Sequence, residues 1–229
     1  MSAASRFLLV DTSDRIALVG IYDGATTLAE VRADCGRPSL EWVTRSIDDV
    51  QKSAGASWEA LDFLACGVGP GGFTSLRIGM SVLKAMGQSL NLPMVGVNRL
   101  EAAAMGQHLL DGRPGTARYW VRLPAAQNLE YAAMYRISES DTPVCLRKPS
   151  LLLPQKAASL NIPAAVVRVT VRPEIFHQGL PRAAWLKALK GRTESAAGIL
   201  PLYLRGATLG PAGGALKAAL SVARRRRAR

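Results

Sequence analysis

The 229-residue sequence contains few cysteines, few histidines and no long hydrophobic run. Its three cysteines (Cys35, Cys66 and Cys145) are odd in number and widely spaced, so they predict neither a disulfide framework nor a metal site. The two histidines form no His-x-x-x-His pair, and we expect His108 to cap a helix or meet solvent and His177 to lie in a loop. No stretch approaches the roughly 20 apolar residues of a membrane helix, so we expect no membrane association.

Composition indicates a globular chain, with 48% hydrophobic and 20% charged residues. Its length allows one large domain or two small ones. The apolar run that precedes Asp11 is too short for a signal peptide, and a reducing cytoplasm suits the unpaired cysteines. We therefore expect a cytoplasmic protein.

Basic residues exceed acidic ones, with 29 Lys and Arg against 17 Asp and Glu and a net charge of +12. Such an excess suits a polyanionic partner. Part of it is local, because Arg224–Arg227 and Arg229 crowd the end of the sequence. A solvated tail is the simpler interpretation of this cluster, and direct RNA contact is the alternative.

The hydrophobic pattern predicts an α/β fold with mixed sheets. Short apolar runs separated by turn residues predict strands, and runs with a 3.6-residue period predict helices. The expected strands are 7–10, 16–22, 27–33, 62–68 and 93–97, and the expected helices are 39–54 (Ser39 as N-cap), 74–90 and 99–110.

A turn-rich segment at 111–115 marks the clearest boundary in the sequence. Beyond it we expect strands at 118–123 and 129–137, strand and loop material from 143 to 171, a short helix at 182–190, and a closing segment at 201–206. We therefore expect three units: an N-terminal lobe over 1–112, a smaller lobe over 113–209, and a Gly/Ala-rich and basic tail over 210–229.

The segment from Gly69 to Gly79 is the most distinctive part of the sequence. Glycines at 69, 71 and 72 allow close backbone approach, and the start of the following helix has unpaired N–H groups that could hold an anion. No Gly-Lys-Ser/Thr follows, and the spacing differs from Gly-x-Gly-x-x-Gly. A tight structural turn is therefore favoured over a phosphate cradle.

The helix at 74–90 is apolar on two faces. One face carries Leu76, Met80, Leu83, Gly87 and Leu90, and Ile78 and Val82 lie nearly opposite. One face must cover the sheet, and the other needs a second helix of this chain or of a partner. Trp42 lies off the apolar face of the preceding helix, where it covers a loop or contacts a partner.

At Gly69–Gly79 the sequence reads Gly-Pro-Gly-Gly-Phe-Thr-Ser-Leu-Arg-Ile-Gly, which resembles the Gly-Pro-Gly-Ser-Phe-Thr-Gly-Leu-Arg-Ile-Gly signature of the TsaB family. Further matches are Leu-Leu-Val-Asp-Thr-Ser at 8–13, Leu-Pro-Met-Val-Gly-Val at 92–97 and Pro-Leu-Tyr-Leu-Arg at 201–205. The first 110 residues fit the family well. The middle fits poorly, because 123–131 lacks the usual Asp-Ala-Arg and only Glu130 and Tyr131 match the Glu-Val-Tyr end.

The resemblance implies an actin-like (ASKHA, ribonuclease H-like) fold of two lobes, related to TsaD but with a degenerate active site. It also implies that helices 39–54 and 74–91 mediate homodimers and pairing with a TsaD-like catalytic subunit. The residues expected at this partner interface are Trp42, Leu76, Met80, Leu83, Gly87 and Leu90. The signature turn itself comprises Gly69, Pro70, Gly71, Gly72, Phe73, Thr74, Arg77 and Gly79.

No constellation of catalytic residues or metal ligands is evident in the sequence. Asp11 and Thr12 occupy the position where actin-like ATPases approach metal and phosphate, so ATP or ADP binding is one interpretation. The other, which we favour, is that Asp11 caps a turn.

The leading hypothesis is a noncatalytic TsaB-like subunit that pairs with TsaD and supports N6-threonylcarbamoylation of adenosine 37 in tRNA. A TsaE-like ATPase would join this complex, a homodimer would form without TsaD, and tRNA contact would be indirect or through the arginine tail. The alternatives are a stand-alone actin-like ATPase or kinase and a basic RNA-binding adaptor.

Overall fold

The computed structural model describes residues 5–36, 38–138 and 141–203, so the predicted tail at 210–229 lies outside the described residues. Two mixed sheets organise the chain. The five-stranded sheet has the order β3-β2-β1-β4-β5, and the four-stranded sheet has the order β8-β7-β6-β9. Within the described ranges, no helix combines the length and apolar character needed to cross a membrane.

The first sheet, called sheet A here, forms around two parallel strands buried on both faces. Sheet A consists of β1 (Arg6–Asp11), β2 (Ile16–Asp23), β3 (Thr26–Asp34), β4 (Phe63–Gly69) and β5 (Met94–Asn98). β1 pairs antiparallel with β2 and parallel with β4, and β4 pairs parallel with β5. Gly24, at φ +58°, closes the turn between β2 and β3.

The second sheet, sheet B, consists of β6 (Thr116–Ala125), β7 (Leu129–Ser138), β8 (Asp141–Leu152) and β9 (Val167–Thr170). β6 and β7 form a regular antiparallel pair from Thr116–Ser138 to Ala125–Leu129. Tyr119, Val121 and Ala133 point to the inner, buried face. Trp120 and Ala132 point to the outer face, where they form a smaller cluster with Ile162 and Val166.

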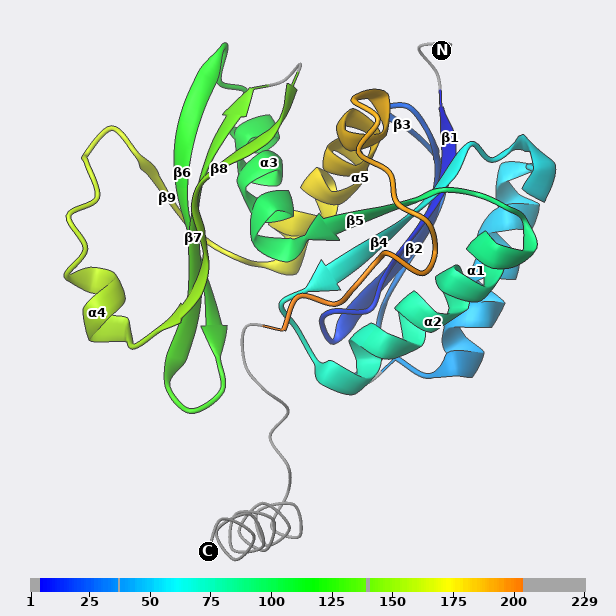
Figure 1. Ribbon diagram of the computed structural model, residues 1–229, viewed down its shortest axis with the longest axis horizontal. Coiled ribbons are helices and arrows are strands. Elements are labelled where there is room, and N and C mark those ends of the chain that lie inside the picture. Colours follow the sequence, from blue (N-terminus) through cyan, green and yellow to red (C-terminus); the bar gives the residue numbers. More distant parts are fainter. Residues whose placement is uncertain (1–4, 37, 139–140, 204–229) are drawn as a thin grey trace, which may run out of the picture.

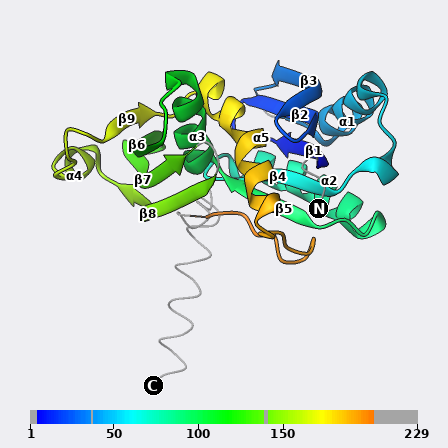
Figure 2. The ribbon, with the colours of Figure 1, turned by 90° about the horizontal axis from the view of Figure 1, so that it is seen from above.

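The helices arrange these sheets in layers, as Figures 1 and 2 show from two directions. The helices are α1 (Leu40–Ala54), η1 (Trp58–Ala60), α2 (Phe73–Ser89), α3 (Arg99–Asp111), α4 (Pro154–Ala158) and α5 (Pro173–Leu189). α1 and α2 cover one face of sheet A, and their side chains share a core with it. α3 and α5 lie between sheet A and the inner face of sheet B.

Glycines bring α3 and α5 into close backbone contact. A Cβ at Gly106 would overlap the carbonyl oxygen of Ile175, and one at Gly179 would overlap that of Ala102. Small residues at a helix crossing let the two axes approach closely. This central pair joins the core residues of the two sheets into one cluster.

The elements expected in the first 111 residues are confirmed to within one residue at each end. Local signals explain this agreement. Ser39 Oγ accepts a hydrogen bond from the Trp42 amide at 3.1 Å, and Gly55 ends α1 at φ +57°. Asn98 caps α3 in the same way by accepting from the Leu100 amide at 2.7 Å.

Three expectations for the histidines and the last helix are wrong. The last helix, α5, spans Pro173–Leu189 and includes Pro181, whereas a short helix was expected at 182–190. His177 therefore lies in a helix and is 1% exposed. His108 is fully buried, and its Nδ1 lies 2.9 Å from Tyr119 Oη, so it is neither a cap nor solvated.

Candidate functional site

The glycine-rich turn packs directly against the turn that follows β1. The Gly72 amide donates to the carbonyl oxygen of Ser13 at 3.2 Å. A Cβ at Gly71 would overlap that same oxygen, and a Cβ at Gly79 would lie 2.5 Å from Thr12 Oγ1. The glycines are thus required by close backbone packing, as the structural interpretation of this turn expects.

Asp11 and Thr12 are engaged inside the protein. Asp11 is 1% exposed, and its carboxylate accepts from the Ser13 amide at 3.2 Å and from Ser13 Oγ at 3.1 Å. His177 Nε2 lies 3.6 Å from Asp11 Oδ2. Thr12, which is 2% exposed, donates from Oγ1 to the Ser75 carbonyl at 2.7 Å. Asp11 therefore caps a turn, which is the interpretation favoured from the sequence, and the side chains of Asp11 and Thr12 are both buried.

A cavity of about 750 Å3 opens in front of the glycine-rich turn, between the loops of sheet A and the β6–β7 hairpin. We call it the interlobe cavity. Residues from both sides line it, among them Ser13, Asp14, Gly71, Gly72, Ser75, Arg99, Pro124 and Tyr131. Its volume suits a small organic ligand.

Arg99 and Asp14 form a largely buried ion pair at the wall of this cavity. The Arg99 guanidinium also lies 4.5 Å from the centre of the Phe176 ring. Burial lowers the pKa of Arg99, and the nearby carboxylates of Asp14 and Asp11 oppose that shift. No motif or periodicity in the sequence indicates this pair, because its two members lie far apart in the chain.

The interlobe cavity does not fit a magnesium nucleotide. Among the described residues that line it, Asp14 is the only carboxylate. That carboxylate pairs with Arg99 and accepts from the Arg15 amide at 2.7 Å. Magnesium needs carboxylate oxygens that are free to bind it. Across the described residues, no group of three His, Cys, Asp or Glu side chains is placed to hold a metal ion.

Four of the six residues expected at a partner interface lie in the core instead. Leu76, Met80 and Leu83 are 1%, 4% and 0% exposed, and Gly87 is also buried. They contact sheet A, so the prediction that they form the partner surface is wrong. Since α2 is apolar on two faces, the sequence alone could not show which one the sheet would take.

The outward side of α1 and α2 carries other apolar residues. Leu40 is 58% exposed and Phe73 is 39% exposed. Together with Thr74, Arg77, Ile78 and Ser81 they line a pocket of about 330 Å3 between the first turns of the two helices. We call this region the α1–α2 face. Trp42 is half-buried against the core beneath α1.

Two residues of the signature also hold the closing segment of the chain. The Arg77 guanidinium lies 3.9 Å from the centre of the Phe73 ring, and its Nε donates to Tyr203 Oη at 2.9 Å. The rings of Phe73 and Tyr203 lie 5.0 Å apart. The Leu202 amide donates to the Val68 carbonyl at 2.7 Å. The sequence match at 201–205 thus has a structural counterpart beside the glycine-rich turn.

The two mixed sheets with helices between them define an α/β protein. YeaZ from Pseudomonas aeruginosa has this fold, with a TM-score of 0.76 at 20% identity over 87% of this chain and 100% of that chain. In sequence, the TsaD family (tRNA N6-adenosine threonylcarbamoyltransferase) matches residues 33–138. The chain is therefore similar to TsaB (YeaZ) and to TsaD, in agreement with the resemblance and the fold expected from the sequence.

Two further proteins are similar to this chain in sequence. The Escherichia coli tRNA threonylcarbamoyladenosine biosynthesis protein TsaB is 28% identical over 135 residues, 59% of this chain and 57% of that protein. An uncharacterised protein of Mycobacterium tuberculosis is 29% identical over 209 residues, 88% of this chain and 92% of that protein. The alignment thus spans little more than half of the Escherichia coli relative.

Proposed function

We propose that the protein is a noncatalytic TsaB-like subunit that binds a TsaD-like subunit and supports the formation of threonylcarbamoyladenosine in tRNA. The observation that carries this proposal is the α1–α2 face, which lies on the helices that bear the TsaB-like signature. Leu40 and Phe73 expose apolar side chains there beside a pocket. Exposed apolar side chains around a recess favour a protein partner.

The lack of a catalytic role is supported by how the acidic residues are used. Asp11 contacts Ser13 and His177, and Asp14 pairs with Arg99. Each carboxylate is thus held by internal partners, whereas an acid, base or metal ligand must reach the substrate. A subunit that acts only by binding a partner needs no such residue.

Co-purification with the TsaD-like protein of the same organism tests this proposal. Leu40→Arg and Ser81→Arg place charge on exposed positions of the α1–α2 face without touching the core. We expect both variants to fold and to lose the partner. Leu153→Arg, at a position that is 55% exposed beside α4, should bind like the wild type. Retained pairing in both face variants would contradict the proposal.

The same face would accommodate a second copy of this chain when no TsaD-like subunit is present, and the complex would recruit a TsaE-like ATPase. Light scattering of the isolated protein tests the first point. A dimer that Leu40→Arg converts to a monomer is the expected result. A dimer that survives Leu40→Arg and Ser81→Arg would place the self-contact elsewhere.

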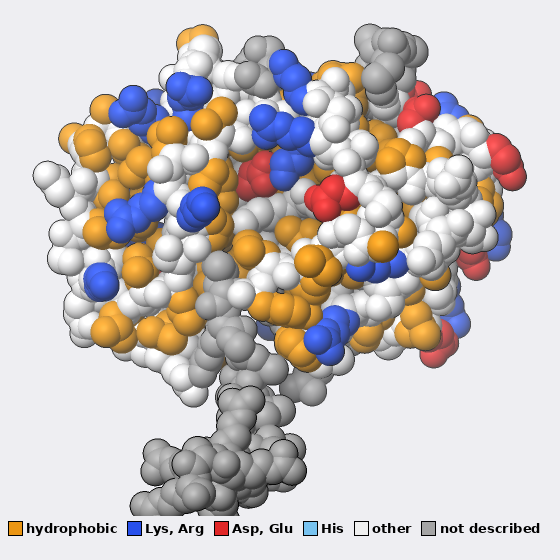
Figure 3. Space-filling view, viewed as in Figure 1, with side chains coloured by type: hydrophobic (Ala, Val, Ile, Leu, Met, Phe, Trp, Pro, Cys, Tyr) orange, Lys and Arg blue, Asp and Glu red, His pale blue; other side chains and the backbone are white. Residues whose placement is uncertain are grey.

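A direct RNA contact is a second candidate, favoured by the outer face of sheet B. Register pairs Arg118 with Arg136, and Met134 with Arg147, on that face. Arg168 joins them from β9 opposite Trp120. Like charges at directly opposite positions of two strands destabilise the sheet unless a bound polyanion neutralises them. Figure 3 shows basic side chains spread over this side of the molecule, at the left.

RNA binding at several salt concentrations tests this contact. The double variant Arg118→Gln and Arg136→Gln should weaken tRNA binding. The slope of log affinity against log salt concentration should also become shallower, by the equivalent of about two phosphate contacts. Deleting residues 216–229 tests the tail separately. If neither change alters binding, tRNA contact belongs to the partner subunit.

The stand-alone ATPase or kinase has weaker support, because the interlobe cavity offers no free carboxylate. Calorimetric titration with ADP and magnesium measures this directly. Tight binding that depends on magnesium would revive that alternative and would count against the proposed role of Asp14 as an internal partner of Arg99.

A further inference from the structure

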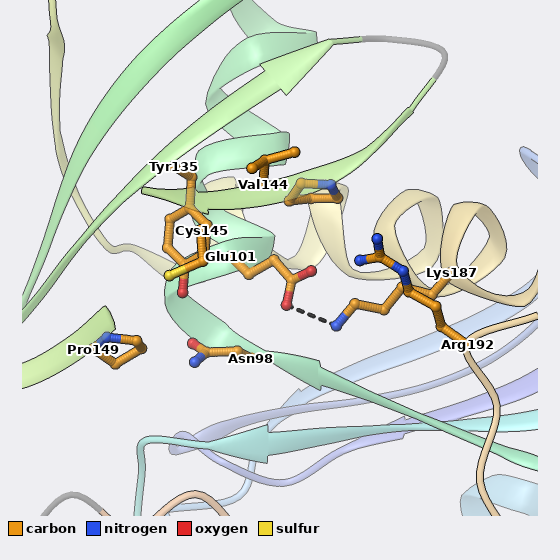
Figure 4. Close-up of a pocket in the computed structure, with 9 residues that line it drawn as sticks. Asn98, Glu101, Tyr135, Val144, Cys145, Pro149, Lys187 and Arg192 are labelled. Atoms are coloured by element: carbon orange, nitrogen blue, oxygen red, sulfur yellow. Dashed lines mark hydrogen bonds and ion pairs between the residues drawn. The ribbon is translucent and has the colours of Figure 1, made fainter. Parts of the chain in front are cut away.

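A second pocket, which shares no residue with the α1–α2 face, lies between β7, β8, α3 and α5. Its volume is about 360 Å3, and we call it the Tyr135 pocket. Figure 4 shows the carboxylate of Glu101 pointing toward Lys187, with Arg192 beside Lys187 and with Tyr135 and Cys145 on the other side of Glu101. None of the residues expected from the sequence to form a site lies here.

Tyr135 provides the strongest indication of a ligand. Although the residue is only 3% exposed, its hydroxyl opens onto the pocket and forms no hydrogen bond with the described residues, so it is free to donate to a ligand. Burial and the nearby Glu101 carboxylate raise the pKa of Tyr135, so the hydroxyl stays protonated and donates at neutral pH.

The remaining polar groups of the pocket are mostly donors as well. Lys187 Nζ donates to Glu101 Oε2 at 2.8 Å and to the Gly96 carbonyl at 3.0 Å, which leaves one N–H free. Asn98 Oδ1 accepts from the Leu100 amide, so its NH2 group is left to donate. The exposed guanidinium of Arg192 forms no ion pair within the described ranges.

These donors call for an anion. The lining has two cations, Lys187 and Arg192, against the single carboxylate of Glu101, so one negative charge would balance it. The opposite wall is apolar and comes from Pro143, Val144 and Pro149 of β8. A donor-rich end and an apolar wall together suit a carboxylate with a short carbon chain.

We propose that the Tyr135 pocket binds a small organic monocarboxylate, whose oxygens accept from the Tyr135 hydroxyl and the Arg192 guanidinium while its carbon chain lies against the β8 wall. Lys187 and Asn98 supply further donors at its rim. This site shares no residue with the α1–α2 face. Its occupancy and the proposed pairing with a TsaD-like subunit can therefore fail independently.

The proposal is tested by titrating the full chain with acetate, propionate and acetamide. Binding is monitored through the backbone amide NMR signals of Asn98, Cys145 and Arg192. Acetate and propionate should shift these signals saturably with millimolar dissociation constants, and propionate should bind more tightly. Acetamide has nearly the same shape without the charge and should bind about tenfold more weakly or less. Equal binding of acetamide, or no saturable shift, would overturn the proposal.

Variants separate binding from folding. Tyr135→Phe removes only the hydroxyl, so we expect the thermal midpoint of unfolding to be unchanged or higher and propionate affinity to fall about tenfold. Arg192→Gln should weaken propionate to a similar extent. Arg45→Gln, on the exposed side of α1, should have no effect. Unchanged affinity in Tyr135→Phe and Arg192→Gln refutes the site, and so does a lowered midpoint in Tyr135→Phe, since the hydroxyl would then have a structural partner.

Discussion

Asp11 and His177 face each other in the interior, with 3.6 Å between Asp11 Oδ2 and His177 Nε2 and each side chain 1% exposed. Asp11 ends β1 of sheet A, and His177 lies in α5 of the central layer. The contact therefore ties the turn beneath the glycine-rich segment to the helix that joins the two sheets. Asp11, for which the sequence left a turn cap and a nucleotide contact as alternatives, has a structural role here.

Replacing Asp11 tests that structural role. Asp11→Ala leaves the Ser13 amide and Ser13 Oγ without their buried acceptor and removes the carboxylate that lies 3.6 Å from His177 Nε2. The free energy of unfolding should fall by about 2–4 kcal/mol, because buried donors without partners are costly. Urea denaturation measures it. Asp49→Ala, at an exposed position of α1, should change stability by no more than about 0.5 kcal/mol. A comparably small change for Asp11→Ala would show that the cluster contributes little.

The glycine-rich turn offers a matched pair of substitutions. Gly71→Ala drives a Cβ into the Ser13 carbonyl oxygen, which is backbone and cannot move aside. Gly72→Ala meets only Ser75 Oγ, a side-chain end that can rotate away. We expect Gly71→Ala to destabilise the protein by about 2 kcal/mol or more and Gly72→Ala by less than about 1 kcal/mol. Thermal unfolding compares them, and equal losses would contradict this account of the turn.

Local signals made much of the fold predictable. Ser39, Asn98 and Gly55 fix helix ends through their own side chains or backbone, so these ends could be located without tertiary information. α5 was not predictable in the same way. Pro181 and the polar His177 argue against a continuous helix, and only packing of Gly179 against α3 explains it.

The sites were less predictable, because they depend on contacts between distant segments. The spacing of Leu76, Met80 and Leu83 identified an apolar face correctly but could not show that sheet A covers it. The pairing of Arg99 with Asp14, and the meeting of Tyr135 with Lys187, arise only when the two sheets pack around α3 and α5. Neither a periodicity nor a motif in the sequence predicts such contacts between distant residues.

The three cysteines should differ in reactivity toward iodoacetamide. Burial, with a smaller contribution from Asp11, raises the pKa of the Cys66 thiol to about 12, so almost no thiolate exists at pH 8. Cys145 is exposed, although burial of its thiol and Glu101 raise its pKa, and Cys35 is partly exposed. Mass spectrometry of the native protein should find label at Cys145 and Cys35 and none at Cys66.

Labelling in denaturant supplies the reference for this comparison, since all three thiols should then react at similar rates. The ratio of native to denatured rates should be smallest for Cys66. If Cys66 in the native protein reacts as fast as Cys145, strand β4 opens far more readily than its complete burial indicates.

Tyr119 should make the protein less stable at alkaline pH. Burial, followed by the charge of Asp111, raises its pKa from 10.0 to about 12 in the folded state. The unfolded chain therefore loses this proton first, so the stability that Tyr119 contributes is complete below about pH 10 and falls between about pH 10 and 12.

In Tyr119→Phe this loss of stability at alkaline pH is absent. From pH 9 to 11 the free energy of unfolding should thus fall by about 1 kcal/mol less in the variant than in the wild type, measured by urea denaturation. At pH 7 the variant should be less stable by about 1 kcal/mol, because His108 Nδ1 loses its partner at 2.9 Å. Parallel pH profiles for the two proteins would show that Tyr119 ionises alike in the folded and unfolded chains.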